Sequence, residues 1–251
     1  MIEASGDMAL GMTGAYDRAI TVFSPQGRLY QVEYALETVR SGSTALSLIT
    51  DSGVVLAVEE RMHTKLQSPD FSWKIFQIDD HIGAATAGLN SDARVLVDNA
   101  RIYSQTLRLS YDEEPSVEAI ARRVGDIMQL YTQHAGVRPF GTALLVGGVD
   151  RTGPRLFYAE PSGLVLEYNA WAIGRGAEKV REIFENEYSR SVSLDDGVKL
   201  ALKSLVASVD KIEEGWTVRL VTIPVATRKY TMVEARALQP LLEGLLKEKK
   251  Q

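Results

Sequence analysis

The feature that most constrains the fold of this sequence is the grouping of its strand and helix patterns. Two apolar strand patterns near 43–50 and 53–59 are joined by Asp51-Ser52-Gly53, which is a hairpin signal. Further strand patterns lie at 74–79, 81–88, 141–150, 155–163, 167–174, 217–223 and 229–232. Helix patterns lie between these groups, mostly in pairs, at 91–109, 116–134, 176–189, 193–209 and from 233 onward.

This order predicts the fold class. Strands joined as hairpins build antiparallel sheets, whereas strands that alternate with helices build parallel ones. We therefore predict an α+β fold, a four-layer αββα sandwich in which helices flank two stacked antiparallel sheets. No linker, repeat or low-complexity stretch interrupts the 251 residues. A single domain is expected to cover 1–251, which is long enough to bury a substantial core.

Before the first hairpin, the sequence predicts an arm and a helix. Residues 1–15 contain three glycines among small side chains, which is typical of a mobile segment. Ser24 suits a helix N-cap and Pro25 suits the first turn. One apolar face follows at helical spacing, formed by Leu29, Val32, Leu36 and Val39 before Gly42.

The composition excludes several classes of site. The sequence has no cysteine, which excludes disulfides, thiolate catalysis and Cys-ligated zinc and indicates a cytoplasmic protein. Its net charge of −5 provides no field to hold nucleic acid or anionic lipid. No apolar run approaches the roughly 20 residues of a membrane-spanning helix. Because His63, His81 and His134 are widely spaced, we predict neither a metal site nor a cofactor.

Ser43 and Thr44, at the start of the first predicted strand, are the candidate nucleophiles. A hydroxyl needs a base, and in N-terminal-nucleophile hydrolases that base is the α-amine of the nucleophile itself. This amine becomes free only when the preceding bond is cut, yet here an amphipathic helix precedes Ser43. Spacing alone leaves the catalytic and structural interpretations open and favours the structural one.

Two other patterns have competing interpretations. Gly174-Arg175-Gly176 lies between a strand and a helix, where helix N–H groups can bind phosphate. A third glycine and a βαβ setting are missing, so a tight turn is favoured over nucleotide binding. Lys74 precedes an apolar strand. It is either a solvated charge or a proton-transfer partner for a nearby hydroxyl, and its sequence position does not separate the two.

Four blocks of the sequence resemble the archaeal-type α subunits of the 20S proteasome: "AYDRAITVFSPQGRLYQVEYALETVRSGSTAL", "AGLNSDARVLVDNAR", "QHAGVRPFGTALLVGGVD" and "GPRLFYAEPSG". The resemblance runs from about Ala15 to the last helix. It implies the N-terminal-nucleophile hydrolase fold, which is the αββα sandwich already predicted from hairpin order.

The resemblance also implies that this chain is not itself an enzyme. In this family the β subunits carry the catalytic threonine, and α subunits are their non-catalytic relatives. Ser43 matches the nucleophile position, Glu59 the acidic partner and Lys74 the catalytic lysine. Arg175 stands where β subunits have a serine, and "VDKIEEGW" replaces another β-subunit loop. With the preceding helix retained, Ser43 has no free amine.

Finally, the resemblance implies partners and a gate. Family α subunits form homo-heptameric rings on the β rings, admit unfolded protein substrates in the cytoplasm, and close the axial pore with N-terminal arms. The helix at 91–109 resembles the one that packs between rings. The implied gate residues are Tyr16, Asp17, Pro25 and Tyr34. AAA ATPase tails ending in hydrophobic–Tyr–any residue dock between α subunits, and the implied binding residues are Lys74, Leu29 and Gly88.

Overall fold

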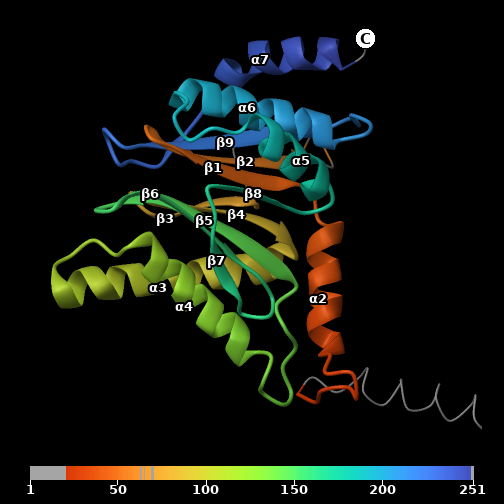
Figure 1. The fold of residues 1–251 in the computed structure, drawn as a ribbon, viewed down its shortest axis with the longest axis vertical. Coiled ribbons are helices and arrows are strands. Elements are labelled where there is room, and N and C mark those ends of the chain that lie inside the picture. The colour runs from red at the N-terminus through yellow and green to blue at the C-terminus, as the bar shows by residue number, and fades with distance from the viewer. Residues whose placement is uncertain (1–20, 63, 65, 69–70, 250–251) are drawn as a thin grey trace, which may run out of the picture.

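Two five-stranded antiparallel sheets form the centre of the molecule (Figure 1). The computed structural model describes residues 21–249 except 63, 65, 69 and 70. The first sheet has the order β10-β9-β2-β1-β8, with β10 Thr231–Met232, β9 Trp216–Pro224, β2 Gly53–Arg61, β1 Ala45–Thr50 and β8 Ala170–Ile173. The second has the order β3-β4-β5-β6-β7, with β3 Ile75–Asp79, β4 Ile82–Gly88, β5 Thr142–Asp150, β6 Gly153–Ala159 and β7 Val165–Glu167.

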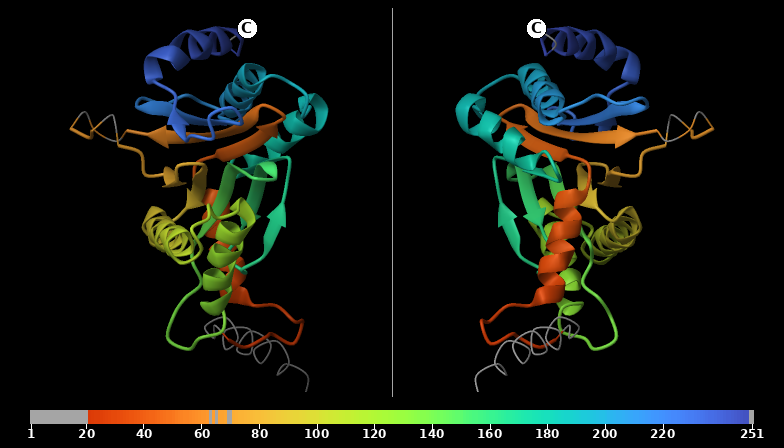
Figure 2. Two further views of the ribbon diagram at one scale, coloured as in Figure 1. Left: turned by 90° about the vertical axis from the view of Figure 1, so that its left-hand side faces the viewer. Right: turned by 90° about the vertical axis from the view of Figure 1, so that its right-hand side faces the viewer.

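Helices cover the outer face of each sheet. The second sheet is covered by α3 (Asn90–Tyr111) and α4 (Val117–Leu130), and the first by α5 (Ala177–Glu187) and α6 (Leu194–Ser208). A further helix, α7 (Ala235–Glu248), packs on the outside of α6. The first helix of the described residues, α2 (Tyr30–Ser41), runs beside the ends of β4 and β5 and covers no sheet face (Figure 2).

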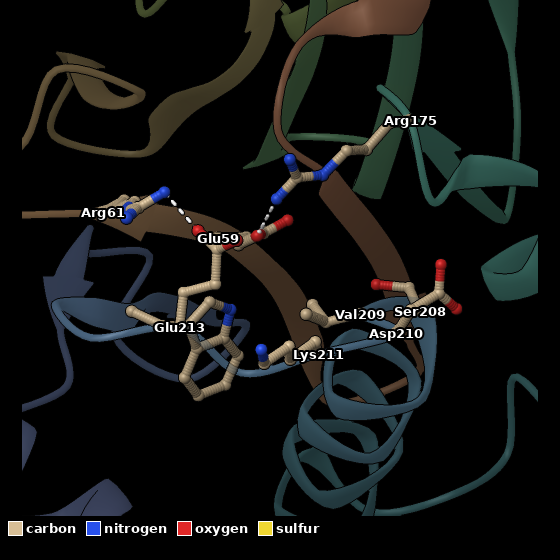
Figure 3. Close-up of a pocket in the computed structure, with 9 residues that line it drawn as sticks. Glu59, Arg61, Arg175, Ser208, Val209, Asp210, Lys211 and Glu213 are labelled. Carbon is tan, nitrogen blue, oxygen red and sulfur yellow. Dashed lines mark hydrogen bonds and ion pairs between the residues drawn. The ribbon is translucent and has the colours of Figure 1, made fainter.

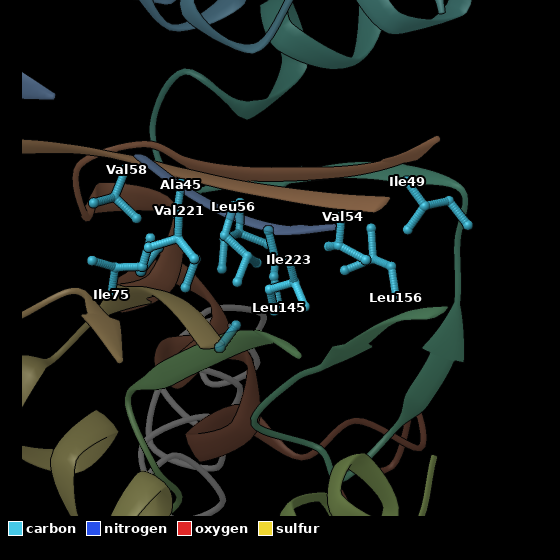
Figure 4. Close-up of a cluster of buried hydrophobic side chains, with 14 of the residues drawn as sticks. Ala45, Ile49, Val54, Leu56, Val58, Ile75, Leu145, Leu156, Val221 and Ile223 are labelled. Atoms are coloured by element: carbon cyan, nitrogen blue, oxygen red, sulfur yellow. The ribbon is translucent and has the colours of Figure 1, made fainter. Parts of the chain in front are cut away.

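The buried side chains form three layers, because each sheet is covered on both faces. One layer fills the space between the sheets (Figure 4), and the others lie between each sheet and its helices. Along β1, Ala45 and Ile49 face the other sheet, whereas Leu46 and Leu48 face the helices. Truncating a fully buried leucine such as Leu46 to alanine removes about 2–5 kcal/mol of stability.

The sandwich predicted from hairpin order is confirmed. One strand pattern, 167–174, differs in detail, because it divides into the end of β7 and all of β8, which belong to different sheets. The helix predicted over 116–134 ends at Leu130, where turn residues follow. The letters SLDD at 193–196 are a capping-box pattern at the start of the helix predicted over 193–209, and the structure confirms the cap, since Ser193 Oγ accepts a hydrogen bond from Asp196 N at 3.1 Å.

The predicted start of the first helix at Ser24 is wrong. α2 begins at Tyr30, after an extended Leu29. The Ser24 hydroxyl accepts from the backbone N–H of Arg28 at 3.1 Å and closes a turn instead of capping a helix. Gly27 in this turn has φ +76°, a left-handed conformation that interrupts a right-handed helix and suits glycine.

An ion pair ties the far end of β3 to α3. Asp79 accepts two hydrogen bonds from the Arg108 guanidinium, at 2.9 and 2.8 Å, and another from the Ser104 hydroxyl. The backbone N–H of Asp80 also donates to this carboxylate, at 2.6 Å. Burial raises the pKa of Asp79, but these hydrogen bonds outweigh it, so the net pKa lies below the ordinary value.

Candidate functional site

Both sheets contribute residues to one polar cluster at an end of the sandwich. The antiparallel register pairs Ala45 of β1 with Val58 of β2, which puts Ser43 and Thr44 beside Glu59. Lys74 enters from the segment before β3, in the other sheet. Arg175 lies in the turn between β8 and α5. The structure therefore brings together Ser43, Glu59, Lys74 and Arg175, which lie far apart in sequence.

The Lys74 ammonium group is the centre of this cluster. Its Nζ donates to the Ser43 carbonyl at 2.6 Å and the Ser43 hydroxyl at 2.7 Å, and to the carbonyls of Thr44 and Glu59 at 3.1 and 3.0 Å. The Ser43 hydroxyl in turn donates to the Glu59 carbonyl at 3.1 Å. Lys74 is only 2% exposed, so all of these bonds form away from solvent.

Burial makes this lysine weakly basic. Desolvation disfavours the ammonium form and lowers the pKa of Lys74 from 10.5 to about 7, although the negative charges of Glu59 and Glu60 act to raise it. The Arg175 charge lowers it further. Lys74 therefore changes charge near neutral pH, unlike an ordinary surface lysine.

Glu59 holds the cluster to its neighbours. One carboxylate oxygen accepts from the backbone N–H of Thr44 at 3.1 Å, and the other accepts from the Arg175 guanidinium at 2.5 Å. The Glu59 side chain is 3% exposed, whereas that of Arg175 is 58% exposed. Arg175 thus neutralises a buried carboxylate while more than half of its side chain remains accessible to solvent.

Helix α2, which leads into Ser43 and β1, is packed into the fold through the buried Val32, Ala35 and Val39. The N–H of Gly42 donates to the Val39 carbonyl at 3.1 Å, and the Gly42 carbonyl accepts from Arg175 N at 2.8 Å. Residues 30–42 are therefore part of the folded domain. A hydroxyl, a lysine and a carboxylate lie together here, but an N-terminal nucleophile also uses its own terminal amine as base, and Ser43 would gain one only if the chain were cut before it.

Gly88 lies beside this cluster, where α2 meets β4. A Cβ atom on Gly42 would come within 2.5 Å of Gly88 N, and one on Gly88 would come within 2.2 Å of the Gly141 carbonyl oxygen. Gly88 also has φ +108°, so both space and backbone conformation require glycine. Lys74 and Gly88 consequently lie at the same end of the molecule.

Other predicted site residues lie elsewhere. Leu29 immediately precedes α2, and the 12 residues of this helix separate Leu29 from Gly42, a span of about 18 Å. Pro25 lies in the turn before α2, and Tyr34, on α2, is 51% exposed. Within one chain, Leu29 does not share a site with Lys74. Tyr16 and Asp17 lie outside the described residues.

A cavity of about 340 Å³, here called the Arg175 cavity, opens beside the cluster (Figure 3). Its walls come from the end of β2, the β8–α5 turn, the end of α6 and the segment that leads into β9. The lining residues are Glu59, Arg61, Arg175, Ser208, Val209, Asp210, Lys211, Glu213 and Trp216. Lys74 is not among them. Sequence reasoning missed this cavity, although the charged run Glu59-Glu60-Arg61 at the end of an apolar strand was a signal.

Glu60 fixes the segment that delivers Lys74. Its side chain lies on β2 and is buried, and one oxygen accepts from the Ser72 hydroxyl at 2.5 Å and from Trp73 N at 3.1 Å. The Ser72 hydroxyl accepts in turn from the N–H of Ile75 at 3.2 Å. Glu60 therefore sets the backbone position from which the Lys74 side chain extends.

The described residues hold no group of histidine and carboxylate side chains arranged to bind a metal ion. His81, for example, is buried and its Nε2 bonds to the Pro115 carbonyl at 2.9 Å. Among the helices in the described part of the chain, none is long and apolar enough to cross a membrane.

Comparison with known proteins gives a consistent result. The sequence matches the family model described as Proteasome subunit over residues 39–223, and the N-terminal signature of A-type proteasome subunits over residues 16–37. It is 52% identical over 221 residues to the alpha-type proteasome subunit of Methanocaldococcus jannaschii, covering 88% of this chain and 85% of the relative. It is 45% identical over 241 residues to the alpha-type proteasome subunit of Methanothermobacter thermautotrophicus, covering 95% and 97%. The resemblance seen in the sequence is confirmed, and the chain belongs to the proteasome α-subunit family.

Proposed function

We propose that this chain is a non-catalytic α subunit of a 20S proteasome core particle. In this proposal seven copies form a ring that caps a ring of β subunits in the cytoplasm. The ring controls the entry of unfolded protein substrates, and peptide hydrolysis takes place in the β subunits. The observation that carries the proposal is that α2, which precedes Ser43, buries Val32, Ala35 and Val39 and packs against the ends of β4 and β5, so it is part of the fold and not a removable leader.

The arrangement of Glu59 and Arg175 supports the absence of catalysis. The Arg175 guanidinium forms an ion pair with the Glu59 carboxylate. By the resemblance, Glu59 matches the acidic partner of active β subunits. The Ser43 hydroxyl is likewise engaged with a backbone carbonyl, at 3.1 Å. We infer that Lys74 and Glu59 now hold the two sheets together at this end of the sandwich.

The gate is assigned to the N-terminal arm, residues 1–15, and to Tyr16 and Asp17, which follow it. Pro25 and Tyr34 are proposed to hold the arm in its open position, and both are exposed near the start of α2. An arm that changes between two states separated by a few kcal/mol responds to a ligand that favours one of them. Regulatory AAA ATPases are proposed to supply that ligand as a C-terminal tail.

For tail docking we propose Lys74, Gly88 and Leu29. Lys74 and Gly88 belong to the end of the sandwich near Gly42, whereas Leu29 lies at the opposite end of α2. One tail that contacts all three residues would therefore lie between neighbouring subunits. A tail carboxylate is a stronger acceptor for Lys74 Nζ than the neutral carbonyls that it now bonds.

One peptide-hydrolysis experiment on the assembled α–β complex tests these roles. We expect a peptide ending in hydrophobic–Tyr–any residue to stimulate the wild type, and Lys74→Ala to abolish the stimulation. Lys74→Met retains the packing of the buried stem and serves as the matched variant. Deletion of residues 1–16 is expected to raise the basal rate, because it removes the proposed gate. Undiminished stimulation in both Lys74 variants, or an unchanged basal rate after the deletion, would contradict the corresponding role.

The scaffold role has its own readouts in the same preparation. Negative-stain images of the chain expressed alone are expected to show sevenfold rings, also for Lys74→Ala. Intact-mass measurement is expected to find the chain uncut before Ser43. A chain that begins at Ser43 would instead support a self-processed hydrolase.

A further inference from the structure

Two leucines at β7 are exposed although they lie on a face of the strand that belongs to the core. Val165 packs on the α4 side, where a Cβ atom on Gly125 would come within 2.3 Å of its Cγ2. Because side chains alternate along a strand, Leu164 and Leu166 point to the other face, towards the layer between the sheets. Tyr158, opposite Leu166 on β6, packs against that layer. Leu164 and Leu166 are nevertheless 47% and 40% exposed, so the first sheet does not fully cover this edge.

Three aromatic rings continue this apolar surface. The Tyr168 and Trp171 rings stack with their centroids 4.0 Å apart, and the Tyr158 ring lies 6.4 and 6.1 Å from them. All three are only partly buried. The name β7 edge surface is used here for Leu164, Leu166, Tyr158, Tyr168 and Trp171. A contiguous exposed surface of apolar and aromatic side chains is typical of a protein–protein interface.

An exposed aromatic side chain stands at the opposite edge of the same sheet. Phe71 precedes β3 and is 64% exposed. The two residues after it, Ser72 and Trp73, are hydrogen-bonded to Glu60 on β2, so the backbone next to Phe71 is fixed. Since β3 and β7 are the outermost strands of a five-stranded sheet, they lie about 19 Å apart at the usual strand spacing. The left view of Figure 2 shows β3, in gold, and β7, in teal, on opposite sides of the sheet.

A closed ring of identical chains needs two different surfaces on each copy. A twofold dimer brings the same surface of both copies together, whereas a ring joins one surface to another, head to tail. The two surfaces must lie on different sides of the chain, as Phe71 and the β7 edge surface do. An aromatic ring also suits a surface made of other rings and leucines, because aromatic pairs attract beyond the area that they bury.

We infer that Phe71 of one copy packs on the β7 edge surface of the next copy in the ring. The inference rests on the proposed function, because it assigns a contact between neighbouring α subunits. In this contact Phe71 covers Leu164 and Leu166, and it completes the apolar layer that a single chain leaves open at β7. Glu60 is then a positioning residue for Phe71 as well as for Lys74, since it holds the backbone between them.

Charge reversal within the contact provides the test. Phe71→Lys and Leu166→Glu each place a charge against an apolar surface of the neighbouring copy, which is unfavourable. Native mass spectrometry of the chain expressed alone is expected to find heptamers for the wild type and about tenfold fewer for either single variant. The double variant Phe71→Lys/Leu166→Glu gives every head-to-tail contact one lysine and one glutamate, so it is expected to recover about half of the heptamers.

Leu109→Glu is the matched control, because Leu109 is an exposed leucine of α3 outside both surfaces, and it should retain the heptamers. If either single variant of Phe71 or Leu166 also retains them, the assigned contact fails while the scaffold role stands. A twofold contact would pair like charges in the double variant, so a double variant without heptamers would overturn the head-to-tail contact. If the wild type forms no heptamer, the scaffold role fails and the contact fails with it.

Cross-linking gives a second readout that does not depend on the loss of rings. The sequence has no cysteine, and a disulfide forms only when two Cα atoms come within about 7 Å. Oxidised Phe71→Cys/Leu166→Cys is therefore expected to give a ladder of linked chains on a non-reducing gel, whereas each single cysteine variant stays unlinked. A double variant that does not cross-link, or single variants that do, would overturn the contact.

Discussion

The two ends of β3 show two ways to bury a charge. Lys74 precedes the strand and Asp79 ends it, and both are nearly inaccessible to solvent. Asp79 meets the guanidinium of Arg108, whose side chain is 30% exposed, whereas Lys74 meets only carbonyls and a hydroxyl. The pKa of both groups is lowered. For Asp79 this favours the charged form, and for Lys74 it favours the neutral form.

The two residues differ in how firmly the fold holds their charge: the charge of Asp79 is fixed, whereas that of Lys74 can change. An opposite charge keeps Asp79 ionised over the whole neutral range, so this end of β3 is fixed to α3. Backbone dipoles compensate the desolvation of Lys74 only in part, so its charge responds to pH and to nearby groups. The site that we propose for tail docking thus lies at the end of the strand where the charge is less firmly held.

The largest effect should come from Asp79→Ala. The substitution leaves Ser104 and the Asp80 N–H without their acceptor, and it leaves Arg108 only the longer ion pair to Glu114 at 3.9 Å. We expect a loss of about 3–5 kcal/mol in the free energy of unfolding, measured by urea titration. Asp80→Ala, on the exposed turn next to it, is the matched control and should cost less than about 0.5 kcal/mol. A cost below about 1 kcal/mol for Asp79→Ala would remove the contrast between the two ends of β3.

A further effect is expected in the pH dependence of stability. Between pH values of about 7 and 10.5, folded Lys74 binds fewer protons than unfolded Lys74, because folding lowers its pKa. Its contribution to stability should therefore rise with pH across this window. Lys74→Met should flatten the rise. Asp79 acts at the opposite end of the scale: its contribution is lost as pH falls through its lowered pKa. Parallel curves for wild type and Lys74→Met above pH 7 would show that Lys74 is not weakly basic.

The smallest effects should come from the two hydroxyl groups. Ser104→Ala removes a donor to the ionised Asp79 carboxylate and should cost about 1.5–3 kcal/mol, the usual range for bonds to charged groups. Ser43→Ala removes one of four acceptors around Lys74 Nζ and should cost about 0.5–1.5 kcal/mol. Both are measured by urea titration at pH 7. A larger loss for Ser43→Ala than for Ser104→Ala would reverse the comparison.

The sequence allowed the layers of this fold to be predicted, because strand and helix periodicities are local. The hairpin at Asp51–Gly53 and the Ser193 cap both depend on residues a few positions apart. The start of α2 was misplaced for the same reason: Ser24 and Pro25 form a good local start signal, but Gly27 turns the chain before the helix begins.

The candidate site could be predicted only in part. The resemblance correctly grouped Ser43, Glu59 and Lys74, which the structure brings into one cluster. The contacts of Arg175 and Trp216 could not be predicted, because they depend on how the β8–α5 turn and β9 approach the end of β2. The burial of Lys74 likewise depends on how the two sheets pack together. This packing cannot be predicted from a local sequence pattern.

The contacts of Glu60 suggest where this protein tolerates additional sequence. Ser72 and Trp73 are hydrogen-bonded to Glu60 on β2, and the Met62 N–H donates to the Gly215 carbonyl at 2.8 Å. Both ends of the connection from Met62 to Ser72 are therefore fixed. Doubling the length of a closed loop costs only about 0.6 kcal/mol. An epitope inserted after Leu66, which is 94% exposed, should therefore leave Lys74 in place and provide a site for labelling assembled particles.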